Sequence, residues 1–281
     1  MTQLSVRRLL IDLEPSFARH WFGGDPFRTA LFNALSMSFP AGEQFFIDAV
    51  RRAHQALPAD QRAAFDAEVR GFVGQEATHR RIHALFNGHL QAQGYVNEWE
   101  QRIPARVAFI ERGDPRHALA ATACYEHFTA IFAEWLLRHP ARFDGVEPRL
   151  AAMWQWHSAE ESEHRGTAFD LYVALGGDRR WRVRWMRIVT FHFVGDLARQ
   201  TVCNLKRDGE LWRWRTWKSG ARTLFGRGGL IRECFGPWRE WFRRDFHPMK
   251  QAAPGGARWL EQNAQAYSLV GQAPQRPTAP V

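Results

Sequence analysis

Two copies of the motif Glu-x-x-His are the residues of this sequence best suited to chemistry. The first pairs Glu76 with His79 and the second pairs Glu161 with His164, each in a stretch with helical periodicity. Residues three apart on a helix share a face, so the carboxylate and the imidazole of each motif can reach one metal ion. One such motif is weak evidence because it arises by chance in many helical proteins, but two in one chain predict a metal centre.

A single glutamate precedes each motif, one predicted helix earlier. Glu43 is followed by Phe45 and Phe46, and Glu126 lies within the apolar stretch Ala123–Phe128. A carboxylate in apolar surroundings is costly unless it is paired, hydrogen-bonded or bound to a metal. One glutamate from each of two helices, with a Glu-x-x-His from each of two others, is the ligand scheme of di-iron carboxylate bundles. The alternative is that these glutamates pair with arginines on helix surfaces.

The spacing of these residues is consistent with two helical hairpins. The first single glutamate lies 17 residues before Asp60, in a predicted turn, and the first motif begins 16 residues after it. The second glutamate and the second motif are 35 residues apart, and their midpoint falls in the predicted turn at residues 142–145. Antiparallel helices therefore place each pair at one level, roughly 25 Å from its turn at about 1.5 Å per residue.

Long stretches with helical periodicity, without period-2 alternation, predict an all-α chain. The expected main helices cover residues 26–57, with a kink or restart at Pro40, then 61–93, 115–139 and 147–175. Residues 94–114 form a long connection that can cross the length of the bundle, which is the ferritin-like topology. Shorter helices are expected at 179–207, 210–224 and 230–244.

These elements divide the chain into four parts. The parts are an N-terminal segment (1–20), a ferritin-like dimetal bundle (21–178), a basic helical extension packing on the bundle (179–250) and a loosely ordered tail (251–281). The tail is expected to be loosely ordered because it contains too few apolar side chains to offset the entropy of ordering it.

The composition favours a globular protein of the cytoplasm. Of the 281 residues, 45% are hydrophobic, which is enough for a large core. The three cysteines show no CxxC spacing and leave one without a partner, which fits a reducing compartment. The first residues lack the apolar region of a secretory signal, and no apolar run approaches the ~18–20 residues that span a bilayer.

Positive charge is concentrated in the predicted extension. Residues 179–250 carry 18 Lys and Arg against 6 Asp and Glu, and 7 of the 13 tryptophans, in a chain with a net charge of +9. A basic, tryptophan-rich segment suits an anionic lipid surface, so we expect residues 181–194 to form an interfacial helix and the protein to lie peripherally on the inner face of the membrane. The alternative is that the basic residues lie on solvated helix faces and that the tryptophan side chains cover the bundle. A nucleic-acid partner is not expected, because no familiar reading motif is present.

Several longer stretches point to a known family. They are Leu35-Ser-Met-Ser-Phe-Pro-Ala-Gly-Glu43, Gln75-Glu76-x-x-His79-x-x-x-His83, His157-x-x-Glu160-Glu161-x-Glu163-His164 and Asp245-Phe246-His247-Pro248. Over roughly residues 20–250 the chain resembles the ferritin-like family labelled predicted metal-dependent hydrolases. We take that label as a description of metal ligands rather than as evidence of hydrolysis.

A second resemblance concerns a third histidine. The pattern His157-x-x-x-Glu161-x-x-His164 resembles that of the di-iron p-aminobenzoate N-oxygenases, and these three residues form one stripe on a helix. The alternative for His157 is a bond to a carboxylate such as Glu160, or packing among neighbouring tryptophans. The resemblance implies seven metal ligands, namely Glu43, Glu76, His79, Glu126, His157, Glu161 and His164.

Four further residues are expected close to the metals without binding them. Gln75 and Glu160 each precede a ligand glutamate, a position that in di-iron proteins hydrogen-bonds a ligand imidazole from the neighbouring helix. His83 and His127 are expected beside the site, and His83, one turn from a ligand, can be recruited to it.

Carboxylate and imidazole donors without thiolate suit iron or manganese. Our leading hypothesis is an oxidoreductase in which two Fe ions, or Mn or mixed Mn/Fe, activate O2 to hydroxylate, desaturate or N-oxygenate an apolar organic substrate. Its partners would be that substrate, O2 and an electron donor. The sequence leaves open whether the protein forms a homodimer. The alternatives are a metal-dependent hydrolase with a dinuclear centre, a ferroxidase and a membrane-surface binding protein.

Overall fold

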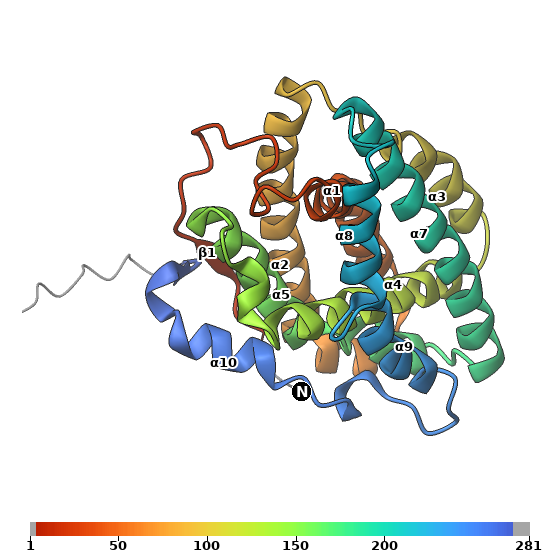
Figure 1. Cartoon of the computed structure of the whole chain (residues 1–281). Coiled ribbons are helices and arrows are strands. Elements are labelled where there is room, and N and C mark those ends of the chain that lie inside the picture. The colour runs from red at the N-terminus through yellow and green to blue at the C-terminus, as the bar shows by residue number, and fades with distance from the viewer. Residues whose placement is uncertain (1–3, 272–281) are drawn as a thin grey trace, which may run out of the picture.

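The computed structural model describes residues 4–271, and these are almost entirely helical (Figure 1). The predicted all-α class is confirmed. In the bundle, α1 packs along α2 and against α4, and α4 packs along α5. The four helices are α1 (Pro26–Ala56), α2 (Ala59–Ala92), α4 (Pro115–Leu137) and α5 (Pro148–His164).

Local sequence sets where the bundle helices begin. The Asp25 side chain accepts a hydrogen bond from the backbone N–H of Arg28 at the start of α1, and Asp114 does the same for Arg116 at the start of α4. In both cases a proline follows the capping residue, where its missing N–H costs nothing. α1 continues through Pro40, so the restart expected there is not observed. Buried side chains on both sides of Pro40 hold the helix together across the lost hydrogen bond.

The fourth predicted helix is divided in two. α5 ends at His164, and α6 (Thr167–Ala174) begins after a short break at residues 165–166. A side chain at Gly166 would have its Cβ only 3.1 Å from Met249, so the glycine allows the later chain to approach closely here. The break lies directly after the second motif, so the motif itself remains helical.

The long connection between α2 and α4 is not irregular throughout. It contains a 3-10 turn, η1 (Glu100–Arg102), followed by the short helix α3 (Ile103–Glu111). α3 packs against α4 and α1, and its Phe109 is 75% exposed.

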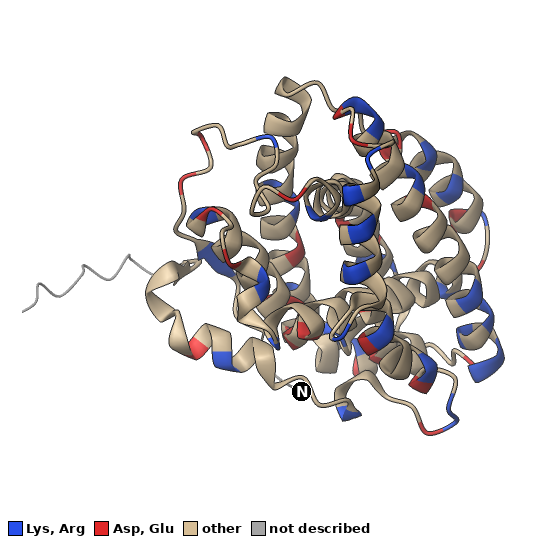
Figure 2. Ribbon diagram, viewed as in Figure 1, with Lys and Arg blue, Asp and Glu red and all other residues tan. Residues whose placement is uncertain are grey.

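Three helices follow the bundle, close to the predicted positions. α7 (Arg179–Arg207) has the predicted bounds and packs against α1 and α4. α8 (Trp214–Phe225) packs against α1, and α9 (Leu230–Glu240) against α4 and α8. Lys and Arg recur along these helices (Figure 2). Among residues 4–271, no helix is long and apolar enough to cross a membrane.

The expectation of a loosely ordered tail is wrong for much of its length. After η3 (Pro248–Lys250), α10 (Pro254–Gln262) packs on α5, and η4 (Ala264–Ala266) leads into β2 (Tyr267–Leu269), which pairs antiparallel with β1 (Arg7–Leu9). Gly256 permits this packing, because a Cβ there would lie 2.8 Å from the backbone oxygen of Ala159. Residues 272–281 of the predicted tail lie outside the described part.

Candidate metal centre

All seven predicted ligands lie in the dry interior of the bundle. Their side chains come from the four bundle helices, which carry them into one region of the core. Each residue is at most 3% exposed, and the set is Glu43, Glu76, His79, Glu126, His157, Glu161 and His164.

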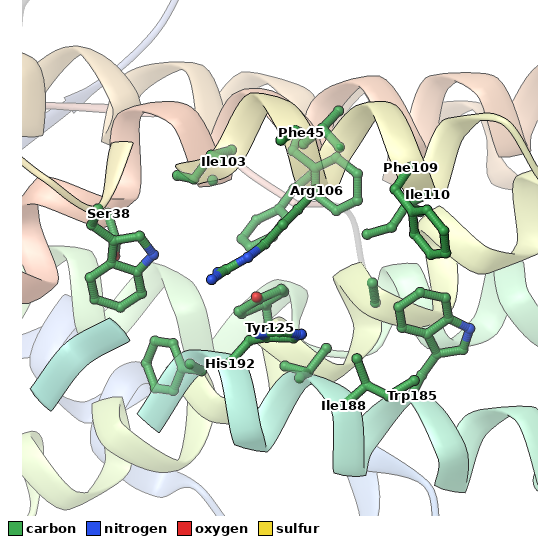
Figure 3. A pocket seen from close by; sticks show the side chains of 18 of the residues that line it. Ser38, Phe45, Ile103, Arg106, Phe109, Ile110, Tyr125, Trp185, Ile188 and His192 are labelled. Atoms are coloured by element: carbon green, nitrogen blue, oxygen red, sulfur yellow. The ribbon is translucent and has the colours of Figure 1, made fainter. Parts of the chain in front are cut away.

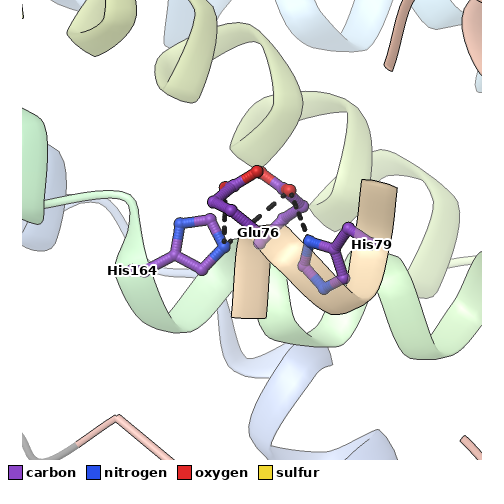
Figure 4. A group of neighbouring side chains, drawn as sticks. Glu76, His79 and His164 are labelled. Atoms are coloured by element: carbon purple, nitrogen blue, oxygen red, sulfur yellow. Dashed lines mark ion pairs between the residues drawn. The ribbon is translucent and has the colours of Figure 1, made fainter. Parts of the chain in front are cut away.

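The two Glu-x-x-His motifs meet in one cluster (Figure 4). One ligand atom from each of the four residues lies within 4.8 Å of the others. His164 Nε2 is 3.5 Å from Glu76 Oε1, and His79 Nδ1 is 3.5 Å from Glu161 Oε1. This arrangement brings together donors from α2 and α5, as expected if the two motifs form one metal centre.

A second group adjoins the first and contains Glu43, His83 and His157. His157 Nε2 lies 3.0 Å from Glu161 Oε1, so Glu161 stands between the two groups. His83 Nε2 lies 2.7 Å from His157 Nδ1. The position of His83 one turn after His79 is the sequence feature that indicates its place here.

Hydrogen bonds fix which nitrogen of His157 faces the cluster. Asn87 Nδ2 donates to the Ser36 carbonyl (2.9 Å), so Asn87 Oδ1 accepts from the Ser36 hydroxyl (2.7 Å). That hydroxyl can then only accept from His83 Nδ1, 2.9 Å away, which leaves His83 Nε2 to accept from His157 Nδ1. His157 Nε2 therefore presents a lone pair toward Glu161, and His83 is an orienting partner rather than a free ligand.

The two motif histidines are oriented in the same manner, each by a carboxylate. His79 Nε2–H donates to Glu160 Oε2 (2.9 Å), as expected of Glu160. His164 Nδ1–H donates to Glu126 Oε2 (2.8 Å). Each imidazole thereby directs its other nitrogen at the cluster, which is the usual arrangement behind a metal-bound histidine. Glu126, predicted as a ligand, reaches the cluster here through His164.

An arginine that the sequence analysis missed closes one side of the site. Arg7 donates to Glu160 (3.1 Å) and to both oxygens of Glu163 (2.6 and 3.0 Å). Gln75 donates to Glu163 (2.9 Å) and to the Ser5 carbonyl, so it joins this network and contacts no ligand imidazole. Burial lowers the pKa of Arg7, but Glu163 and Glu160 outweigh that effect and keep the guanidinium charged.

The expectation that His127 lies beside the site is not met. Its Nε2–H donates to the Pro237 carbonyl (3.2 Å), and its ring packs against Trp241, 5.0 Å between ring centres. Successive residues of a helix point about 100° apart, so the residue after Glu126 faces the outer helices instead of the core.

Burial raises the pKa of several of these carboxyls. The pKa of Glu43 and of Glu76 is held well above the ordinary value, mainly by burial and by the charges of neighbouring glutamates, and the pKa of Glu126 is raised to about 7. Burial lowers the pKa of His79, but the hydrogen bond to Glu160 and the negative charges of Glu160 and Glu161 raise it to about 10. Without a metal, protons therefore supply the positive charge that this group of carboxylates requires.

The residues fit a bound cation. Buried polar atoms without a hydrogen-bond partner cost about 1–3 kcal/mol each, and here they concentrate at the predicted ligands. These atoms are both carboxylate oxygens of Glu43 and Glu76, one oxygen of Glu126 and of Glu161, His79 Nδ1, His157 Nε2 and His164 Nε2. Oxygen and imidazole nitrogen donors of this kind suit divalent transition metals.

A small cavity of about 50 Å³ reaches this group. His157 and Glu161 line one part of it, and Phe39, Trp154 and Phe193 are among its apolar walls. A reacting group can therefore approach Glu161 from the apolar side.

Comparison with known proteins gives one match. The model of the family described as "predicted metal-dependent hydrolase" matches residues 5–252. No curated protein and no solved structure shows a significant match. Among these comparisons nothing supports the resemblance to N-oxygenases.

The family description contradicts our hypothesis of an oxidoreductase that activates O2 and favours the hydrolase that we had placed second. The O2 and electron-donor partners are withdrawn with that hypothesis. The same carboxylate and imidazole donors serve both chemistries, so the ligands could not distinguish them. Since the match covers most of its length, the chain belongs to the predicted metal-dependent hydrolase family.

Proposed function

We propose that the protein is a hydrolase whose metal ions are held by the buried glutamates and histidines of the bundle. The observation that carries this proposal is the concentration of unpartnered donor atoms in one dry cluster, within a chain of a metal-dependent hydrolase family. We further propose a dinuclear centre of iron or manganese. Its ligands are Glu43, Glu76, Glu161, His79, His157 and His164, with Glu160, Glu126 and His83 orienting the three imidazoles.

A metal ion in this cluster would supply Lewis acidity, polarising the bond to be cleaved and lowering the pKa of a water. The chain itself keeps the donors in place. Glu160 and Glu126 fix the ring orientation of His79 and His164, and the row through His83 fixes that of His157. Because no ligand ring must rotate, the centre is preorganised for its reaction.

The surroundings of the cluster exclude bulk water. Phe39 packs over the histidines, with its ring centre 4.7 Å from that of His157, and Phe72 lies 5.0 Å from His164. Electrostatic interactions are stronger in such an environment than in water, which favours a group that polarises the substrate.

The test is hydrolysis under anaerobic conditions. Protein freed of metal with a chelator would be loaded with Fe²⁺, Mn²⁺ or Zn²⁺ and assayed against carboxylic esters, amides and phosphate esters. We expect activity without O2, including with the redox-inert Zn²⁺, and its loss when the chelator is returned. Metal-loaded protein that cleaves none of these compounds contradicts the proposal.

Two substitutions, one on α5 and one just before it, distinguish hydrolysis at the metal centre from nonspecific hydrolysis. Glu161→Gln should abolish activity and lower the metal content, whereas Glu147→Gln, at the partly exposed residue that precedes α5, should change neither. Metal analysis also tests the proposal of a dinuclear centre, because a metal-loaded protein that binds only one ion per chain contradicts that proposal.

We also propose that the protein acts in the cytoplasm against an anionic membrane surface. The three cysteines are free thiols, which supports a reducing compartment. Trp212 and Trp214 are 90% and 65% exposed beside exposed Arg213 and Arg215, the combination that suits a lipid headgroup region.

A further inference from the structure

A large apolar cavity lies between α1, α3, α4 and α7 (Figure 3). Its volume is about 340 Å³, within the range of roughly 300–1,000 Å³ typical of small-molecule sites. Aromatic and branched side chains form most of its wall, including Phe45, Phe46, Trp99, Ile110, Trp185 and Ile188.

Most polar groups in the wall already have partners within the protein. The Ser38 hydroxyl donates to the Leu35 carbonyl (2.7 Å). Arg106 is paired with the buried carboxylate of Asp196. The Trp185 indole N–H donates to His117 Nδ1 (3.1 Å) and the Thr129 hydroxyl to the Glu126 carbonyl (3.0 Å). Figure 3 also shows the hydroxyl of Tyr125 and the ring of His192 in the wall. A sugar or nucleotide would lose its hydrogen bonds to water in this wall, whereas an apolar chain would lose none.

The cavity adjoins a smaller one that reaches the metal cluster. Phe39, Thr129 and Phe193 line both this cavity and the smaller one of about 50 Å³. The smaller cavity is also lined by His157 and Glu161. A molecule whose apolar part fills the large cavity can therefore extend its functional group to the cluster.

We propose that this cavity holds the straight acyl chain of the substrate, a carboxylic ester whose carbonyl lies at the smaller cavity beside Glu161. The inference rests on the proposed hydrolysis and names its substrate class. Water supplies the oxygen that bonds to the carbonyl carbon, the acyl C–O bond breaks, and the alcohol leaves with a proton from that water, so the products are a fatty acid and an alcohol.

Chain length should govern both catalysis and binding. Each methylene moved from water into the cavity contributes about 0.8 kcal/mol, which is about fourfold in kcat/KM or in Kd. The gain should continue with each added methylene until the cavity is full and then stop, because further carbons remain in water.

The test uses p-nitrophenyl esters from acetate to palmitate with the metal-loaded, full-length protein. The leaving group is constant, so any rise in kcat/KM reports on the acyl chain. In parallel, calorimetry measures the binding of the corresponding fatty acids, which requires no turnover. We expect both series to rise about fourfold per methylene over several carbons and then level off.

One glycine allows the cavity to be filled without disturbing the helix. Gly42 lines the cavity, and the nearest atom to a Cβ placed there is the Phe46 ring at 4.0 Å, so a side chain is accommodated. Gly42→Leu should shift the preferred ester to shorter chains and weaken the binding of long acids at least tenfold. Gly88→Leu is the matched control: this exposed glycine of α2 also has open space around it, and its replacement should leave both series unchanged.

The outcomes separate this inference from the proposed function. Ester hydrolysis without dependence on chain length, or a Gly42→Leu protein that behaves like the parent, overturns the assignment of the cavity and leaves the hydrolase intact. Fatty acids that bind more tightly with each methylene, in a protein that cleaves no carboxylic ester, amide or phosphate ester, support the cavity as an acyl site and contradict the proposed function.

Discussion

Replacing Glu76 by glutamine should stabilise the metal-free protein and prevent its stabilisation by metal. The carboxylate is fully buried, and neither of its oxygens has a hydrogen-bond partner. Burial, followed by the charges of Glu126, Glu161 and Glu43, raises its pKa well above the ordinary value. Glutamine keeps the shape of the side chain but cannot carry the charge that burial and these neighbours oppose.

The magnitude follows from the cost of keeping this carboxyl protonated in the folded protein at pH 7, since each pH unit above its ordinary pKa of 4.5 adds about 1.4 kcal/mol, to at most about 3 kcal/mol. We expect the Glu76→Gln protein, freed of metal at pH 7, to gain free energy of unfolding of that order. For a chain of this size this is a rise in the melting temperature of about 2–10 °C. Metal at a thousand times its Kd should add about 4 kcal/mol to the parent and little to the variant.

The sign of the pH dependence gives a second measurement. A carboxyl whose pKa is raised in the folded state binds its proton more tightly when folded than when unfolded. The metal-free parent should therefore lose stability as the pH rises above the ordinary glutamate value of 4.5 toward the raised pKa. In Glu76→Gln this loss should be smaller, because one of the groups responsible is absent.

Thermal and urea unfolding of both proteins, with chelator and with Zn²⁺, measures these effects. Glu147→Gln removes a partly exposed carboxylate from an ion pair with Arg149 and serves as the control. It should change stability by less than about 1 kcal/mol in either condition. A metal-free Glu76→Gln protein less stable than the parent, or one stabilised by metal as strongly as the parent, would refute the reasoning.

Three further measurements test other parts of the structure. Glu126→Gln should weaken metal binding about 10–100-fold without removing it, because Glu126 orients His164; competition with a chromogenic chelator measures this, and unchanged affinity would show that the contact is dispensable. Alkylation of the native protein should modify Cys203 before the buried Cys124 and Cys234, which mass spectrometry of digests would show and equal labelling would contradict. Trp212→Ala should reduce flotation with anionic liposomes, and a parent protein that does not float would end the membrane proposal.

Local sequence predicted the parts of the fold that depend on helical periodicity and capping. The bounds of α7 are as expected, and α1, α2 and α4 differ by a few residues at their ends. The two Glu-x-x-His motifs also indicated that Glu76 and Glu161 would belong to one metal centre, and the structure brings them together. These features were accessible because each depends on residues that are close in the chain.

Features that depend on contacts between residues far apart in the chain could not be predicted from the sequence. β1 pairs with β2 across most of the chain, with Arg7 opposite Leu269, and no periodicity in either segment indicates the other. The contact of Arg7 with Glu160 depends on that pairing. The tail therefore seemed too polar to order, although α10 packs closely on α5 through Gly256.

The residues that bind the metal do not by themselves determine which reaction the centre catalyses. The orientation of His79, His157 and His164 is fixed by hydrogen bonds behind each ring, and these would be equally useful for any divalent cation. What distinguishes one reaction from another is the access route and the group that it admits. Here the approach to Glu161 is narrow and apolar, and it adjoins a larger apolar cavity. We therefore expect the choice of substrate to depend on the residues around Phe39 and Gly42, outside the ligand set.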